Sequence, residues 1–224
     1  MKRLLLASGV INAICLITLI LFAGIQLPAF GMWFYRWQYG VNETYAAVNM
    51  EPEDLHEVTL HMIRYMQGRE PDLQIMTTVA GEQRYFFSEI EIRHMVDVYD
   101  LFAIGLSLQN MLILLFLMSL CLFLFHGQGH FRTLFKSSQI GALGVFASLA
   151  LLIGIIAVNW HHAFVVFHEI FFDNDYWILD PSVDLLINIV PYAFFITTSV
   201  FIGGFFALGL ILLFVGATLA LRRT

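Results

Sequence analysis

The stretch Leu4–Leu27, LLLASGVINAICLITLILFAGIQL, contains no charged side chain. A helix needs about 20 consecutive apolar residues to cross the hydrocarbon core of a bilayer, and this stretch exceeds that length. A cleavable signal peptide is the alternative. However, the apolar run is longer than the ~7–15 residues of a signal core, and no small-x-small cleavage motif follows it. The stretch therefore predicts a retained transmembrane helix that ends at Pro28.

Three more stretches have the length and composition of membrane spans, at residues 101–125, 140–158 and 192–221. Of the 224 residues, 59% are hydrophobic and only 12% are charged, whereas soluble domains carry about 25% charged residues. The mean hydropathy is +0.79. We predict an all-α integral membrane protein with four transmembrane helices, the first within residues 1–27. The net charge of −6 argues against nucleic acid as a partner, because proteins that bind it are usually basic.

Charge is divided unequally between the segments that flank these helices. Residues 1–3, the loop 126–139 and the last residues of the chain carry six Lys or Arg and no acid. All seventeen carboxylates lie in residues 28–100 and 159–191. Because basic residues mark the cytoplasmic side, both termini and the loop 126–139 are predicted to be cytoplasmic, and the two acidic segments to face outward.

The first outer segment, residues 28–100, predicts a small extracellular α/β cap. Residues 53–66 carry apolar side chains at helical spacing and predict an amphipathic helix over the membrane, ended by Gly68 and Pro71. Five aromatic residues follow the first span and are expected at the headgroup level: Trp33, Phe34, Tyr35, Trp37 and Tyr39.

A hairpin and a helix start complete this cap. Residues 73–79 and 85–87 predict two strands, with the turn at residues 80–82. Ser88 and Glu91 have the spacing of a capping box. They predict the start of a helix that continues directly into the second span.

The second outer segment, residues 159–191, contains an apolar stretch at 160–172 that is too short to span a membrane. This stretch is expected either to extend the third helix or to lie in the interface. Residues 173–175 are polar and should end it. Asp180 followed by Pro181 predicts another helix, with Asp180 as the cap and Pro181 at the first helical position.

Two histidines in these outer segments are candidates for chemistry. His94 precedes the second span by seven residues, which places it about 10 Å outward at ~1.5 Å per residue. Asp97 shares its helix face and is placed to orient the imidazole, and Arg93 has the spacing for an ion pair with Asp97. His168 lies beside Glu169 in the other outer segment. A shared site near the outer headgroup layer is the functional interpretation; two structural histidines are the alternative.

The other polar residues of the second outer segment have simpler interpretations. Asp180, Asp184 and Trp177 suit a cap, a counter-charge and an interface anchor. His161 and His162 are adjacent, so they face different sides of a helix and are expected to pack at the interface. No HExxH, CxxC or HxH spacing is present, so no metal site is predicted.

On the residues alone, two further functional classes stay open. One is a metal-dependent membrane hydrolase that uses His94, His168 and the outer carboxylates as ligands. The other is a non-enzymatic accessory subunit of a transporter. The predicted spans carry no charged residue, whereas transport paths through membranes commonly use such residues. This difference argues against a transport path through these helices.

Two motifs and the four-span plan resemble a known family. The motifs are EIEIRHMVDVYDLF at residues 89–102 and FHEIFFDNDYW at residues 167–177, the latter followed by the segment LDP, Asp184 and Pro191. They are similar to motifs of the bacterial lipoprotein intramolecular transacylases, called Lit. The segment YMQG at residues 65–68 and the hairpin at Gly81 fit the same pattern, so the resemblance extends over nearly the whole chain.

The resemblance implies an acyltransferase of the bacterial cell membrane with its active site on the extracellular side. Such a transacylase moves the sn-2 acyl chain of an S-diacylglyceryl lipoprotein to the α-amine of its N-terminal cysteine. The product is a lyso-form lipoprotein, N-acylated and S-monoacylglycerylated. The partners implied are the diacylglyceryl-modified lipoprotein and membrane lipid. No cofactor is implied, and a monomer is expected.

By the same resemblance, His94 and His168 match the catalytic pair. Acid–base help from an imidazole suits ester aminolysis, where it contributes ~10²–10⁴-fold. The remaining candidates are expected to orient the histidines or shape the site: Arg93, Asp97, Glu169, Asn174, Trp177, Asp180 and Asp184.

Overall fold

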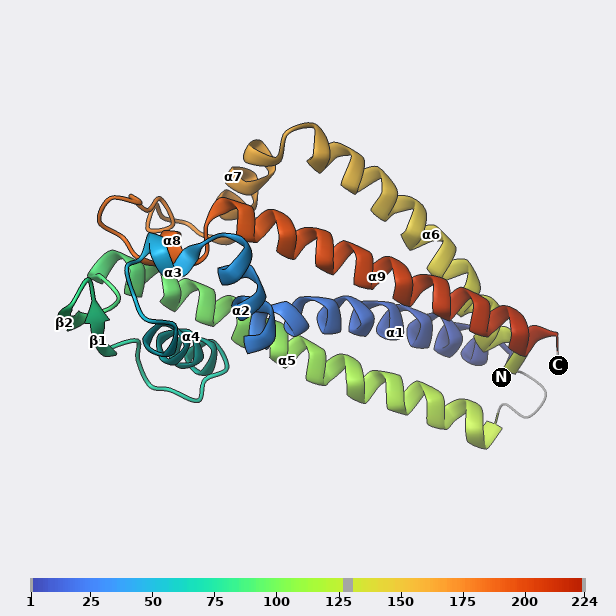
Figure 1. Cartoon of the computed structure of the whole chain (residues 1–224). Coiled ribbons are helices and arrows are strands. Elements are labelled where there is room, and N and C mark those ends of the chain that lie inside the picture. The colour runs from blue at the N-terminus through green and yellow to red at the C-terminus, as the bar shows by residue number, and fades with distance from the viewer. Residues whose placement is uncertain (1, 127–130, 223–224) are drawn as a thin grey trace. The chain divides into compact units, whose positions relative to one another are not determined.

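The computed structural model describes residues 2–126 and 131–222, which are largely helical (Figure 1). The chain divides into two compact units. The membrane unit comprises residues 1–25, 107–158 and 201–224, and the cap unit comprises residues 26–106 and 159–200.

Long helices supply the membrane unit. They are α1 (Lys2–Phe30), α5 (Glu89–His126), α6 (Phe131–Val158) and α9 (Tyr192–Leu221). Within the described residues, α1, α5 and α9 are long and apolar enough to cross a membrane. The fourth predicted span lies inside α6 and stays a prediction. Because α6 begins at Phe131, most of the predicted loop 126–139 is helical instead, while residues 127–130 lie outside the described part.

Helix α1 does not stop at Pro28, as the sequence had predicted, but continues to Phe30. Gly31 ends it: its backbone is extended, with φ −89° and ψ 100°. A Cβ atom at Gly31 would lie 2.3 Å from the carbonyl oxygen of Leu27 and 2.5 Å from Nε1 of Trp33. Only glycine leaves room for this close turn into the next helix.

Apolar packing and side-chain hydrogen bonds join the helices of the membrane unit. Ile17, Ala142 and Leu210 belong to a buried cluster contributed by α1, α6 and α9. The Asn12 side chain donates a 2.9 Å hydrogen bond to the Ser119 hydroxyl. Interhelical hydrogen bonds of this kind supplement van der Waals packing where lipid offers no hydrophobic drive.

The cap unit contains shorter elements together with one end each of α1, α5 and α9. The elements are α2 (Met32–Val41), α3 (Thr44–Ala47), α4 (Pro52–Met66), β1 (Met76–Val79), β2 (Glu82–Tyr85), α7 (Trp160–Phe171) and α8 (Leu186–Ile189).

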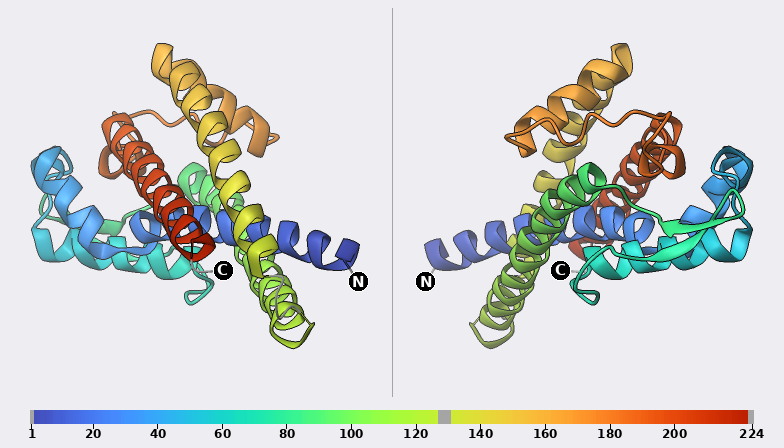
Figure 2. Two further views of the ribbon diagram at one scale, coloured as in Figure 1. Left: turned by 90° about the vertical axis from the view of Figure 1, so that its right-hand side faces the viewer. Right: turned by 90° about the vertical axis from the view of Figure 1, so that its left-hand side faces the viewer.

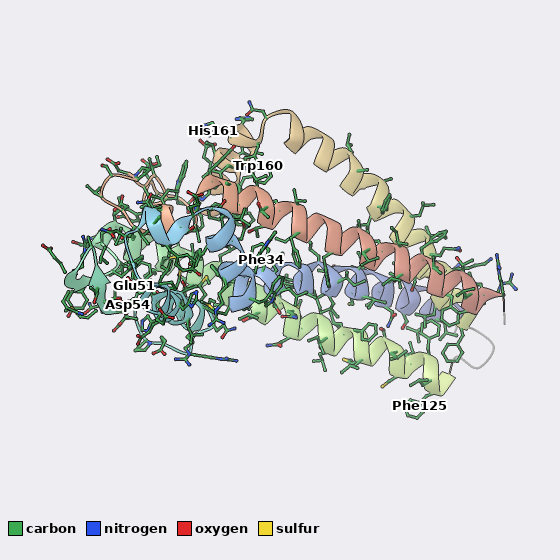
Figure 3. All side chains as sticks on the ribbon, in the orientation of Figure 1. Phe34, Glu51, Asp54, Phe125, Trp160 and His161 are labelled. Atoms are coloured by element: carbon green, nitrogen blue, oxygen red, sulfur yellow. The ribbon has the colours of Figure 1, made fainter. Side chains whose placement is uncertain are left out.

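Helix α2 divides the aromatic cluster between two faces. Trp33 and Trp37 are about half exposed, whereas Phe34, Tyr35 and Tyr39 are buried. The expected position of the five rings at the headgroup level stays a prediction. Phe34 packs inside the cap unit with its ring edge-on to Phe194 (Figure 3).

Helix α4 confirms the predicted amphipathic helix. It begins one residue earlier, with Pro52 in its first turn, and Glu51 and Asp54 lie at this end (Figure 3). At the other end Gly68 adopts φ +70°. The Arg69 N–H donates to the Arg64 carbonyl, which is the bond that closes a Schellman cap and favours glycine.

The hairpin beside α4 is tighter than predicted (Figure 2). Val79 pairs with Glu82, so only Ala80 and Gly81 form the turn. Their φ angles are +53° and +82°, as a two-residue type I′ turn requires. The return strand therefore begins at Glu82, and the prediction of residues 85–87 is wrong by three residues.

The predicted capping box at the start of α5 is confirmed, and its two side chains also bind a second segment of the chain. The carboxylate of Glu91 is fully buried. One of its oxygens accepts from the Ser88 N–H and the other from the Leu186 N–H at the start of α8. The Ser88 hydroxyl in turn donates to the Asp184 carboxylate. These bonds tie the start of α5 to the chain that precedes α9.

Asp180 does not cap a helix, contrary to the prediction. Its carboxylate accepts from the N–H and hydroxyl of Ser182 in an isolated turn, and α8 begins only at Leu186. A helix that continued from this turn would use the Leu186 N–H, but the Glu91 carboxylate accepts that N–H instead.

Replacing Glu91 with Gln is expected to destabilise the protein. The amide keeps one acceptor oxygen and turns an N–H₂ donor toward a backbone N–H, so one buried donor loses its partner. The expected cost is about 1–3 kcal/mol, measured as a lower midpoint of thermal unfolding in detergent. Glu89→Gln is the matched control, since the Glu89 side chain is 81% exposed; an equal loss in both variants would contradict this account.

Candidate functional site

Helices α5 and α7 bring His94 and His168 together inside the cap unit. Their ring centroids lie 6.1 Å apart, with the planes tilted by 36°. His94 lies in the second turn of α5, just after the buried Glu91 carboxylate. His168 lies in the last turn of α7 and is 6% exposed. The predicted convergence of two distant segments is thus observed.

One ring nitrogen of His168 is committed to the helix backbone. Its Nδ1 lies 2.7 Å from the Phe164 carbonyl oxygen. A carbonyl can only accept, so Nδ1 carries the hydrogen in the neutral ring. Nε2 then holds the free lone pair, which is the state needed in a general base. Glu169 does not perform this orienting role, because its side chain is exposed on another side of α7.

Aromatic rings enclose the His168 imidazole. The Trp177 ring stacks on it at 4.7 Å with planes 27° apart, and the Phe164 ring lies at 4.3 Å. Phe172 contacts both histidines. Burial among these rings lowers the pKa of His168 below its ordinary value of 6.5, against an opposing effect of the hydrogen bond to Phe164. The imidazole is therefore neutral at pH 7.

His94 offers a buried polar atom that the protein itself does not use. Its Nδ1 is buried and has no hydrogen-bond partner within residues 2–126 and 131–222. An unpaired buried polar atom costs stability, which makes it a candidate contact for a substrate. Since two imidazolium charges 6.1 Å apart would repel each other in this partly buried place, the pair favours at most one proton.

The polar residues around His94 have partners other than those predicted. Asp97 accepts a 2.8 Å hydrogen bond from the Asn174 side chain. The expected ion pair of Arg93 with Asp97 is wrong: Arg93 pairs with Glu89, one turn earlier, and stacks over the Tyr176 ring.

These contacts hold the chain that follows α7 against α5. The side-chain oxygen of Asn174 accepts the Tyr176 N–H at 3.0 Å while its nitrogen binds Asp97. The resulting turn delivers Trp177 onto His168. Asn174 and Trp177 thus belong to the site. Asp180 and Asp184 instead belong to the network around Ser88.

A depression of about 500 Å³ opens on the side of α7 where Glu169 lies. Asp173 and Asp175 line it together with Phe172 and Trp177, two of the rings that contact His168. The walls nearest the histidine are therefore aromatic, and the outer walls carry carboxylates.

The enclosing rings are the feature that sequence reasoning missed. Phe164 and Phe172 stand four residues before and after His168, and residues at that spacing share one helix face. This spacing is the signal that could have identified them.

His161 and His162 lie at the start of α7, where the Asn159 side chain caps the helix by accepting the His162 N–H (Figure 3). Both side chains are exposed, and the His161 ring contacts Tyr192. In the described part of the chain, no three His, Cys, Asp or Glu side chains are grouped to hold a metal ion.

Comparisons with known proteins agree on one family. The family model of the lipoprotein intramolecular transacylase Lit matches residues 10–195. No sequence relative is found among curated proteins.

Solved structures show the same fold. One structure of the membrane-integral lipoprotein intramolecular transacylase Lit from Bacillus cereus matches with a TM-score of 0.80 and 18% identity, over 100% of both chains. A second, in which a histidine is replaced by alanine, has a TM-score of 0.77 and 18% identity, over 99% of this chain and 96% of that one. A third, with arginine in place of a histidine, has a TM-score of 0.75 and 19% identity, over 100% and 93%. The chain therefore belongs to the Lit family and is a membrane acyltransferase, a lipoprotein intramolecular transacylase.

Proposed function

We propose that this enzyme moves the sn-2 acyl chain of an S-diacylglyceryl lipoprotein to the α-amine of its N-terminal cysteine, with His94 and His168 as the catalytic pair. The observation that carries the proposal is the free Nε2 of His168, 6.1 Å ring to ring from a second, half-buried histidine. Nucleophile and ester belong to one substrate molecule, so correct placement removes much of the entropic barrier.

His168 is assigned as the base. The neutral amine attacks the sn-2 ester carbonyl, and Nε2 of His168 takes the proton that the attacking nitrogen releases. As the tetrahedral intermediate collapses, the carbon–oxygen bond to the glyceryl group breaks and the same proton passes to the leaving oxygen. The amide and the free glyceryl hydroxyl form without gain or loss of atoms.

His94 is assigned to the oxyanion. Its Nδ1 has no protein partner within the described residues, so an N–H there is available to the oxygen that becomes negative in the intermediate. A single donor of this kind typically contributes ~10²–10³-fold. Asp97 supports the site indirectly, because it holds Asn174 and thereby the turn that carries Trp177.

The site is assigned to the outer face of the bacterial membrane. All seventeen carboxylates lie in residues 28–100 and 159–191, and the segments 1–3 and 131–139 carry only basic charges. The positive-inside rule then places the cap unit outside, where lipoprotein N-termini lie. No specific observation favours the metal-dependent hydrolase or the transporter subunit.

Replacement of either histidine is expected to abolish the product. With His94→Ala or His168→Ala expressed in a bacterium that makes diacylglyceryl lipoproteins with free amines, activity should fall at least ~10²-fold, because the base or the oxyanion donor is lost. Mass spectrometry of a lipoprotein N-terminal peptide measures it. His162→Ala, an exposed histidine of the same helix, should keep full activity. Wild-type levels of N-acyl, S-monoacyl peptide in either site variant would contradict the assignment of His94 and His168 as the catalytic pair.

The pH dependence of the reaction rate should follow the protonation of the substrate amine rather than that of His168. Because the pKa of His168 is lowered from 6.5, its imidazole is already mainly neutral at pH 6.5 and above. The pKa of an N-terminal amine is about 7.7–8.0. The initial rate with a purified lipopeptide should therefore rise from pH 6.5 to about pH 9 and level off above it. A rate that is constant over this range would contradict the assignment.

A further inference from the structure

An aromatic stripe runs along one flank of α7. It consists of Trp160, Phe164, Phe167 and Phe171, at successive intervals of four, three and four residues, and residues so spaced lie on one face of a helix. Figure 3 labels Trp160 at the beginning of the stripe.

The start of α9 covers only the first half of this stripe. The rings of Trp160 and Phe164 contact Tyr192, with centroids 6.4 and 5.7 Å apart. Phe167 and Phe171 contact each other at 4.8 Å, yet they are 45% and 50% exposed. An uncovered pair of aromatic rings is thus left at the end of α7 that carries His168.

This pair is continuous with the reaction site. The Phe167 ring lies edge-on to the His168 imidazole, with centroids 5.3 Å apart. In the proposed function, on which this inference rests, the ester carbonyl must come within reach of His168. The acyl chain starts at that carbonyl carbon, so its first methylenes must leave the site along whatever surface borders the imidazole.

The other flank of α7 does not suit a hydrocarbon chain. Glu169 is one residue beyond His168, about 100° further round the helix. It borders the depression whose outer walls carry Asp173 and Asp175. An apolar chain placed there would contact Phe172 and Trp177, but it would also displace water from the carboxylates of Glu169, Asp173 and Asp175, a cost that the aromatic stripe does not impose.

We propose that Phe167 and Phe171 form an acyl-chain subsite that holds the migrating sn-2 chain. The two residues are about 6 Å apart along the helix axis, so their rings cover several methylenes of a chain lying on them. Each methylene removed from water contributes about four-fold to an equilibrium constant, which makes the subsite sensitive to chain length.

The test compares two synthetic lipopeptides that differ only in the sn-2 chain, palmitoyl in one and butanoyl in the other. Phe171 is the position to change, because it does not contact either histidine directly. Phe171→Ala should lower kcat/KM about ten-fold on the palmitoyl substrate, as expected for the loss of an aromatic contact, and leave the butanoyl substrate unchanged. Phe171→Leu, which restores apolar surface, should recover most of the loss.

Val183→Ala is the control. Val183 is an apolar residue of the same cap unit, 66% exposed, and it lies outside α7. It should leave both substrates unchanged. Equal losses of Phe171→Ala on both substrates, or the same chain-length effect in Val183→Ala, would overturn the subsite. Failure of the proposed function is distinguishable, since the wild-type enzyme would then form no N-acyl product from either lipopeptide.

Discussion

The buried carboxylate of Glu91 is the interaction on which the arrangement of the cap unit depends. Its two oxygens accept backbone N–H groups from Ser88, at the start of α5, and from Leu186, at the start of α8. A buried carboxylate is tolerated only when its oxygens are satisfied, so both segments must meet there. His94 lies one turn further along α5, and its position relative to the chain around α7 follows from this junction.

From that junction the chemistry of the site follows in a short series of contacts. Asp97 holds Asn174, the Asn174 turn delivers Trp177, and Trp177 stacks on His168. The Phe164 carbonyl sets the tautomer of the same imidazole. Aromatic surroundings keep the ring neutral, as proton transfer from an amine at neutral pH requires.

Local signals in the sequence were sufficient for several of the elements. The capping box at Ser88 and the glycine that ends α4 specify their structures through the backbone atoms next to them, so both predictions are confirmed. The wrong predictions concern choices between competing partners. Arg93 can reach Glu89 or Asp97 at the same helical spacing, and only the distant Asn174 decides the outcome.

Contacts with residues distant in the sequence also explain the other differences between the predictions and the structure. Asp180 has the sequence of a helix cap and accepts the Ser182 N–H, but its turn does not continue as a helix, because Glu91 accepts the Leu186 N–H. The burial of Phe34 depends on the arrival of Phe194 from the far end of the chain. The free Nε2 of His168 likewise depends on a hydrogen bond that only the folded helix provides. These contacts exist only in the folded cap unit, so they could not be predicted from the residues nearby in the sequence.

The most direct test of the account uses purified enzyme and a synthetic S-diacylglyceryl lipopeptide with a ¹³C-labelled sn-2 chain. Tandem mass spectrometry then locates the label after reaction. The account predicts a product of unchanged total mass with the label on the α-amine, and no movement of the label when His168 is replaced by Ala. A label that stays on the glyceryl group while an amide forms, or transfer that persists without His168, would contradict it.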